Sequence, residues 1–246
     1  MDVPLRYQEI DMVRGIAILM MICFHTVFDL SFFWIFVSDI SSGFWRYFAV
    51  ATASLFLLIV GISLTLSHAR AAPEMTGYQL ARKFVYRGSG IFLLGLLVTA
   101  VTWLYLGEGY VVFGILHLIG VSIIISPIFF RLKKYSIVAG LFCIAAGFFF
   151  ATLSGPIWLL PLGIHPPTFW SVDYEPIFPG FGIVLIGMGL GGYLYPGGKR
   201  TFTLPAIPAL LMQPLSFLGR HSLIIYLVHQ PVIILILAAV THAKVL

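Results

Sequence analysis

The sequence has few charged residues: only 9% of its 246 residues are Asp, Glu, Lys or Arg, whereas 60% are hydrophobic. In soluble globular domains about a quarter of the residues are charged, and no stretch between the apolar runs is long enough to form such a domain. The composition therefore excludes a soluble protein and predicts a polytopic one embedded in a lipid bilayer. The net charge of +5 does not indicate nucleic-acid binding; its arrangement along the chain is more informative.

Cysteine, signal sequences and repeats are scarce or missing too. Cys23 and Cys143 lie in apolar stretches without metal-binding spacing or a disulfide framework, so we expect buried thiols and no metal. No cleavable signal with a small-residue exit site precedes the first apolar run, and we expect that run to direct insertion itself. No internal repeat is evident, so the inverted-repeat sign of many transporters is missing.

Seven apolar segments are each close to the roughly 20 residues that a helix needs to cross a membrane. We predict spans at residues 12–36, 47–67, 88–106, 110–130, 135–153, 178–196 and 221–241. The predicted fold class is all-α, a bundle of about seven transmembrane helices forming a single transmembrane domain over residues 1–246.

The basic residues support this count. With the N-terminus in the cytoplasm and the C-terminus outside, twelve of the fourteen Lys and Arg residues are cytoplasmic, and only Arg46 and Lys244 are not. That distribution follows the positive-inside rule. We expect a multi-pass protein of the plasma membrane, and the sequence leaves homo-oligomer formation open.

Two segments do not fit a simple span. Residues 201–218 are apolar but contain Pro205, Pro208 and Pro214, and we interpret them as an interfacial or re-entrant segment. Residues 154–177 contain five prolines and predict a structured outer loop, a suitable place to recognise an external substrate.

The first apolar segment contains an unusual set of ionisable residues: Asp11, Arg14, His25 and Asp29. Ionisable groups at membrane depth are costly and usually mark a functional site. Arg14 and His25 are eleven residues apart, about three helical turns, and Asp11 and Asp29 lie within about 60° of the same line. The sequence therefore predicts one polar face on this helix.

His25 is the predicted catalytic base, with Asp29 one turn away to orient the ring and to stabilise the imidazolium. No Gly-x-Ser-x-Gly elbow or other nucleophile motif is present. Direct attack by the acceptor is therefore simpler than a covalent intermediate, although an acyl-histidine stays open. His117 and His229 also lie within predicted spans, and the three histidines would line one path if their helices adjoin. A lone intramembrane histidine is just as often a helix-to-helix hydrogen bond.

Basic residues on the predicted cytoplasmic side suit a phosphate-bearing ligand, because guanidinium groups bind phosphate bidentately. A coenzyme A ester fits, with its pyrophosphate at the basic rim and its thioester near His25. The residues predicted to bind it are Arg82, Lys83, Arg87, Arg131, Lys133, Lys134 and Arg220. A plain topology signal explains any one of them equally well.

Five segments carry a resemblance to a known family: residues 9–20 with Phe24 and His25, then residues 57–63, 113–120, 172–182 and 218–231. Together they resemble bacterial and archaeal members of the heparan-alpha-glucosaminide N-acetyltransferase catalytic-domain family. The first segment, an Arg followed by ten residues and a His, also resembles the opening of the acyltransferase-3 family. That second resemblance implies a catalytic role for His25, with Arg14 as its partner in the motif.

The resemblance implies transfer of an acetyl or acyl group from cytosolic acetyl-CoA to an amine or hydroxyl of a sugar or glycolipid on the far side. We expect the substrates to be bound by Asp11, His117, Asp173, Glu175, Tyr226, His229 and Gln230. The lysosomal enzyme that names the family has more spans, and its catalytic histidine lies in the loop after the first helix. Residues 38–46 contain no histidine here, so either the site has shifted to His25 or the reaction differs. Heparan sulfate itself is not the acceptor that we expect for so small a protein.

Other classes of function stay open on the sequence alone. A proton-coupled transporter would use His25 and Asp29 as a relay, a haem protein would use transmembrane histidine pairs, and a scaffold would not respond to coenzyme A. Solute uptake without consumption of a CoA ester, a Soret band and thermal-shift screening would distinguish them.

Overall fold

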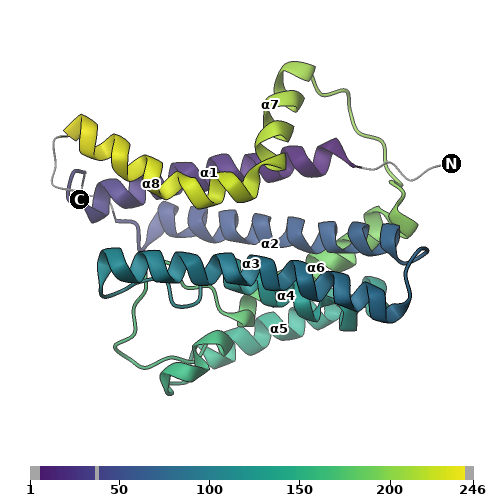
Figure 1. The fold of residues 1–246 in the computed structure, drawn as a ribbon, viewed down its shortest axis with the longest axis horizontal. Helices are drawn as coiled ribbons and strands as arrows, with labels where there is room; N and C mark the ends of the chain where they lie inside the picture. The colour runs from purple at the N-terminus through teal and green to yellow at the C-terminus, as the bar shows by residue number, and fades with distance from the viewer. Residues whose placement is uncertain (1–5, 37–38, 242–246) are drawn as a thin grey trace. The chain divides into compact units, whose positions relative to one another are not determined.

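The computed structural model describes residues 6–36 and 39–241, and within these ranges the chain is helical without a β-strand (Figure 1). This confirms the predicted all-α class of membrane protein. The α-helices are α1 (Gln8–Phe32), α2 (Gly43–Ala71), α3 (Gly77–Leu106), α4 (Ile115–Phe129), α5 (Ser136–Phe150), α6 (Ile177–Leu194), α7 (Ala209–Arg220) and α8 (Ser222–Thr241). Three short 3-10 helices accompany them: η1 (Phe130–Tyr135), η2 (Ile157–Leu162) and η3 (Pro196–Gly198).

Six helical segments in the described ranges are long and apolar enough to cross a membrane. One of them, Ile115–Phe150, has 36 residues and comprises α4, η1 and α5. Helical geometry is interrupted in η1, where Lys133 has a φ of 49°. This break coincides with the cytoplasmic turn that separates two spans in the sequence-based count. The count of seven spans and the side of the membrane on which each terminus lies stay predictions.

Helix boundaries differ from the predicted spans where local chemistry decides them. Helix α3 begins at Gly77 rather than near residue 88, because Thr76 and Gln79 form a capping box at its start. Arg82, Lys83 and Arg87 therefore lie on the first turns of a helix and not in a loop. Helix α1 begins at Gln8 and ends at Phe32, earlier at both ends than predicted.

The two irregular segments are structured. Residues 154–177 contain η2 and are held by isolated bridges that join Ser154 to His165 and Tyr174 to Phe113. Within residues 201–218, the stretch up to Pro208 is irregular, and the rest belongs to α7 in spite of Pro214. The relation of either segment to the bilayer stays a prediction.

The described chain divides into two compact units. The central unit comprises residues 57–203, and the terminal unit comprises residues 6–56 together with residues 204–241. The prediction of one transmembrane domain over residues 1–246 stays a prediction.

In the terminal unit, α7 lies across α1 and α8 runs beside α1 (Figure 1). Helices α1 and α8 run in the same direction, as the first and last of seven spans would have to. The crossing of α1 and α7 occurs at two glycines. A Cβ atom at Gly15 would lie 2.0 Å from the carbonyl oxygen of Leu215, and one at Gly219 would lie 1.8 Å from that of Asp11. Backbones approach this closely only where side chains are absent.

In the central unit, α3 packs on α4 and α5 packs on α6. A core of Leu57, Phe84, Leu118, Val184 and Leu185 is almost fully buried between its helices. Gly187 of α6 allows close helix packing, because a Cβ atom at this position would lie 2.3 Å from the carbonyl oxygen of Leu58. The core thus holds the helices that position the basic residues described below.

Candidate functional site

The predicted polar face of α1 exists, and its first part is an ion-pair cluster. Asp11, whose side chain is buried, accepts hydrogen bonds from both Arg6 and Arg14. Nη1 of Arg14 lies 2.7 Å from Oδ1 of Asp11 and also donates to the carbonyl oxygen of Gly219, 3.4 Å away. Gly219 lies in the last turn of α7, where carbonyl groups lack helical partners and a cation is favourable. Arg14 therefore joins α1 to the end of α7.

The second part of the polar face is a pair of imidazoles from α1 and α8. The ring centroids of His25 and His229 are 4.9 Å apart in an edge-to-face arrangement. Nδ1 of His229 lies 2.6 Å from the carbonyl oxygen of Tyr226. Because a carbonyl oxygen can only accept, Nδ1 carries the proton, and Nε2 of the neutral ring presents a lone pair. A fixed tautomer with an unprotonated ring nitrogen is what a general base requires.

The predicted hydrogen bond between Asp29 and His25 is not formed. Asp29, which is 1% exposed, accepts instead from Nε2 of Gln230 at 2.8 Å, a contact between residues that are 201 positions apart. The physical reason is that α8 places an amide donor directly against the carboxylate. Asp29 and Gln230 therefore link α1 to α8 beside the two histidines.

Four buried polar atoms around these residues lack a hydrogen-bond partner among the described residues: Nδ1 of His25, Oδ2 of Asp29, Nε2 of His229 and Oε1 of Gln230. Each unpaired buried polar group costs about 1–3 kcal/mol, and native structures contain few of them. The four atoms lie together on α1 and α8, where a water molecule or a polar ligand would complete their hydrogen bonds. We call His25, Asp29, His229 and Gln230 the α1–α8 polar cluster.

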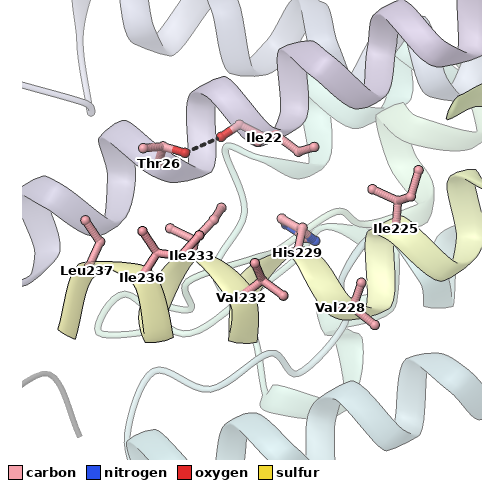
Figure 2. A pocket seen from close by; sticks show the side chains of 9 residues that line it. All are labelled: Ile22, Thr26, Ile225, Val228, His229, Val232, Ile233, Ile236 and Leu237. Carbon is pink, nitrogen blue, oxygen red and sulfur yellow. Dashed lines mark hydrogen bonds between the residues drawn. The ribbon is translucent and has the colours of Figure 1, made fainter. Parts of the chain in front are cut away.

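A groove of about 410 Å³ adjoins this cluster, lined by α1 and α8 alone (Figure 2). Its lining is aliphatic, except for Thr26 and His229. The Thr26 hydroxyl donates to the carbonyl oxygen of Ile22 within its own helix, so its donor is satisfied. His229, 8% exposed, thus supplies the one unpaired polar side-chain atom among the described residues that line the groove.

The sequence-predicted residues of the central unit have local partners. Nδ1 of the buried His117 accepts from the backbone N–H of Gly114, and its Nε2 lies 3.4 Å from the Thr99 hydroxyl. Asp173 accepts from the backbone N–H of Ile115, the first residue of α4. His117 and Asp173 therefore cap α4 at its N-terminus. This geometry supports the structural alternative for His117.

The segment that holds Asp173 and Glu175 is fixed in place. The Tyr174 hydroxyl donates to the carbonyl oxygen of Leu160 at 2.7 Å, and Glu175 donates its backbone N–H to the carbonyl oxygen of Phe113. Burial raises the pKa of Tyr174 to about 12, so its hydroxyl stays protonated as a donor at neutral pH. A role for Asp173 and Glu175 in substrate binding stays a prediction.

Six of the seven basic residues predicted to bind coenzyme A belong to the central unit. Arg82, Lys83 and Arg87 project from α3, and Arg131, Lys133 and Lys134 belong to η1. All six are exposed, and none forms an ion pair in the described part of the chain. Phe84 of α3 packs on Phe130 of η1, with ring centroids 5.0 Å apart, so both basic groups lie at the same end of the unit. Arg220, at the end of α7, belongs to the terminal unit.

Sequence reasoning missed three features of this site: the Asp29–Gln230 hydrogen bond, the carbonyl of Tyr226 as orienting group, and the aliphatic groove. The first depends on long-range packing, and the second on a backbone atom three residues before His229. The third is lined by residues that any span contains.

The described residues contain no group of three or more His, Cys, Asp or Glu side chains that could hold a metal ion.

The chain matches a known protein family. The family model described as heparan-alpha-glucosaminide N-acetyltransferase, catalytic, matches residues 6–231, from the Arg6–Asp11 ion pair to Pro231, which follows Gln230. No curated protein and no solved structure gave a match. Since the family model covers most of the sequence, the chain belongs to the heparan-alpha-glucosaminide N-acetyltransferase catalytic-domain family, and it is a multi-pass membrane protein of the acetyltransferase class.

Proposed function

We propose that the protein transfers an acetyl group from cytosolic acetyl-CoA to an amine or hydroxyl of a sugar or glycolipid at the outer side of the plasma membrane. Family membership supports the acetyltransferase chemistry. The observation that carries the choice of site is the α1–α8 polar cluster, with its four unpartnered buried polar atoms.

The chemistry needs one base and one group that stabilises negative charge. The acceptor nitrogen or oxygen attacks the thioester carbonyl carbon, a C–N or C–O bond forms, and the C–S bond breaks. The acceptor proton moves to an imidazole and then to the departing thiolate, so that the products are the acetylated acceptor and free coenzyme A. No covalent intermediate on the protein is needed.

The hydrogen bond to Tyr226 supports His229 as the base, because it leaves the Nε2 lone pair free. His25, with its ring centroid 4.9 Å away, then donates a hydrogen bond to the thioester oxygen as negative charge develops there. This assignment moves the role of base from His25, where sequence reasoning placed it, to His229, since Asp29 bonds to Gln230 and not to His25. Asp29 and Gln230 present their remaining oxygens, Oδ2 and Oε1, to the acceptor's hydroxyl or amine donors.

The exposed basic residues of α3 and η1 suit the phosphates of a coenzyme A ester, because they are cationic and form no ion pair with the described residues. Arg14 and Asp11 act as positioning residues, since their ion pair fixes α1 against α7. The carbonyl group of Tyr226 is also a positioning group, because it accepts the hydrogen bond from Nδ1 of His229.

The test is acetyl transfer in proteoliposomes. Purified protein receives radiolabelled acetyl-CoA and glucosamine, and both free coenzyme A and acetylated sugar are measured. We expect transfer by the wild type and a loss of about 10²–10⁴-fold in kcat for His229→Ala. Cys23→Ala is the matched control, because Cys23 is exposed on α1 two residues before His25, and it should retain full activity. Full activity of His229→Ala would remove His229 from the mechanism.

A further inference from the structure

The connection between α5 and α6 has an unusual composition for a segment outside the helices. From Tyr135 to Val172 the sequence contains no Asp, Glu, Lys or Arg. Helix α5 ends at Phe150, so more than half of this uncharged stretch follows the helix. In soluble structure about a quarter of the residues are charged. A connection of this length that faced water throughout would carry several charges.

The same connection exposes large apolar side chains. In η2, Ile157 is 61% exposed and Trp158 is 72% exposed, and Leu162 is exposed as well. Their neighbour Leu160 is buried, and its carbonyl oxygen accepts the hydrogen bond of the Tyr174 hydroxyl. One side of η2 is thus packed into the central unit, whereas the other side is apolar and exposed.

Helix α5 is too short to cross a hydrocarbon core by itself. Its 15 residues rise about 22 Å at about 1.5 Å per residue, whereas the core is about 30 Å thick. Lys133 and Lys134 precede α5 and hold its first turn near one interface, because ammonium groups are costly deeper in the membrane. Phe150 at the other end therefore lies about 8 Å short of the opposite edge of the core. The apolar side chains of η2 follow at that depth.

We infer that η2 lies at the interface of the leaflet opposite to η1, with the exposed side chains of Ile157, Trp158 and Leu162 among the lipid acyl chains. This inference does not depend on the proposed acetyl transfer. The exposed side of η2 follows directly on that of α5, where Phe148 is 72% exposed and Phe149 is 61% exposed. Tryptophan is enriched at membrane interfaces. Interfacial segments bury their apolar side by about 5–10 Å, which accounts for the shortfall of α5.

The backbone of η2 suits this place. Irregular backbone is tolerated at membrane depth only where its polar groups are satisfied. Pro156 and Pro161 have no N–H group to satisfy. The N–H of Leu159 donates to the carbonyl oxygen of Pro156, and that of Gly163 donates to the carbonyl oxygen of Leu160. The segment therefore needs few hydrogen bonds from water.

The test is site-directed spin labelling of the protein in liposomes. Cys23 and Cys143 are first changed to Ala, and a nitroxide is then attached to Trp158→Cys. Its collisions with oxygen, which concentrates in lipid, and with a water-soluble nickel chelate are measured by electron paramagnetic resonance. Because the Trp158 side chain is exposed, its replacement removes little packing within the central unit.

Two further labelled positions provide the references. Glu108→Cys is the matched control for water, because Glu108 is exposed and lies in the loop after α3. The carbonyl oxygen of its neighbour Gly109 accepts from the N–H of Val172, so this loop belongs to the same end of the central unit as η2. Phe148→Cys, on the exposed side of α5, is the reference for lipid.

We expect the ratio of oxygen accessibility to nickel accessibility at Trp158→Cys to be several-fold higher than at Glu108→Cys and close to that at Phe148→Cys. A ratio at Trp158→Cys equal to that at Glu108→Cys would place η2 in water and overturn the inference. Protection of Trp158→Cys from both reagents would show that a second copy of the chain or another protein covers η2, and it would also overturn the inference.

A second measurement leaves both native cysteines in place. Tryptophan fluorescence of the wild type and of Trp158→Phe is compared in liposomes of ordinary lipid and of lipid brominated in its acyl chains. Bromine quenches the tryptophans that it contacts, so the contribution of Trp158, taken as the difference between the two proteins, should fall in brominated lipid. An undiminished contribution of Trp158 would contradict the inference even if the spin-labelled variants failed to fold.

Discussion

The crossing of α1 and α7 allows a prediction whose size follows from two distances. In Gly15→Ala, the new Cβ would lie 2.0 Å from the carbonyl oxygen of Leu215, whereas ordinary contact begins at 3.4 Å, a shortfall of about 1.4 Å. The obstructing atoms belong to the backbone of a second helix and cannot rotate away as a side chain would. The two helices therefore have to separate.

Overpacking of this kind costs about 1–3 kcal/mol, and replacing Gly by Ala in a helix regains about 0.5–1 kcal/mol. We expect a net loss of about 1–2 kcal/mol, which corresponds to about 2–8 °C in Tm for a chain of this size. The measurement is thermal unfolding in detergent, followed by tryptophan fluorescence.

Gly90→Ala is the control, because no atom lies within 4 Å of a Cβ built at Gly90 in α3. It should leave the apparent Tm unchanged or raise it slightly. A Gly15→Ala protein as stable as the Gly90→Ala protein would refute the close crossing of α1 and α7.

Three further outcomes are expected. Gln230→Leu leaves the buried carboxylate of Asp29 without its donor, so it should lower the free energy of unfolding by about 1–3 kcal/mol. Gln230→Asn should not restore this stability, because the side chain of Asn is shorter. Equal stability of the wild type and Gln230→Leu in denaturant melts would argue against the hydrogen bond. Lys133→Gln with Lys134→Gln should raise KM for acetyl-CoA with kcat unchanged, and the difference from the wild type should shrink in high salt because exposed charges are screened; a change in kcat alone would point to another role. The pKa of Tyr174 is raised to about 12, so the folded state holds this proton more tightly than the unfolded chain, and the free energy of unfolding should fall as pH rises from about 10 to 12. Tyr174→Phe should reduce this pH dependence in melts at several pH values. An identical pH profile of the variant and the wild type would contradict the burial of Tyr174.

Much of the fold could be predicted from the sequence, because apolar runs of about 20 residues have few alternatives in a membrane. The polar face of α1 was also predictable, since helical periodicity places Arg14 and His25 on one line. The residues that contact this polar face could not be predicted. The contact of Asp29 with Gln230 depends on how α8 packs against α1, and no local pattern encodes a pairing across 201 positions.

Charged residues near helix ends show a second limit. The positive-inside rule identified Arg82, Lys83 and Arg87 as a group, but it does not indicate whether such residues lie in a loop or on a helix. The capping box of Thr76 and Gln79 extends α3 to include them. His117 shows a third limit, because its partners at Gly114 and Thr99 come from backbone geometry and from a neighbouring helix.

The most direct test of the account is a double-mutant cycle on the two imidazoles, measured as kcat for acetyl-CoA-dependent transfer in proteoliposomes. If His25 and His229 act on one transition state, each change to Ala should lower kcat by about 10²–10⁴-fold, and the double variant should be little slower than the slower single variant. Losses that simply multiply, or a single variant with wild-type kcat, would contradict a joint reaction centre on α1 and α8.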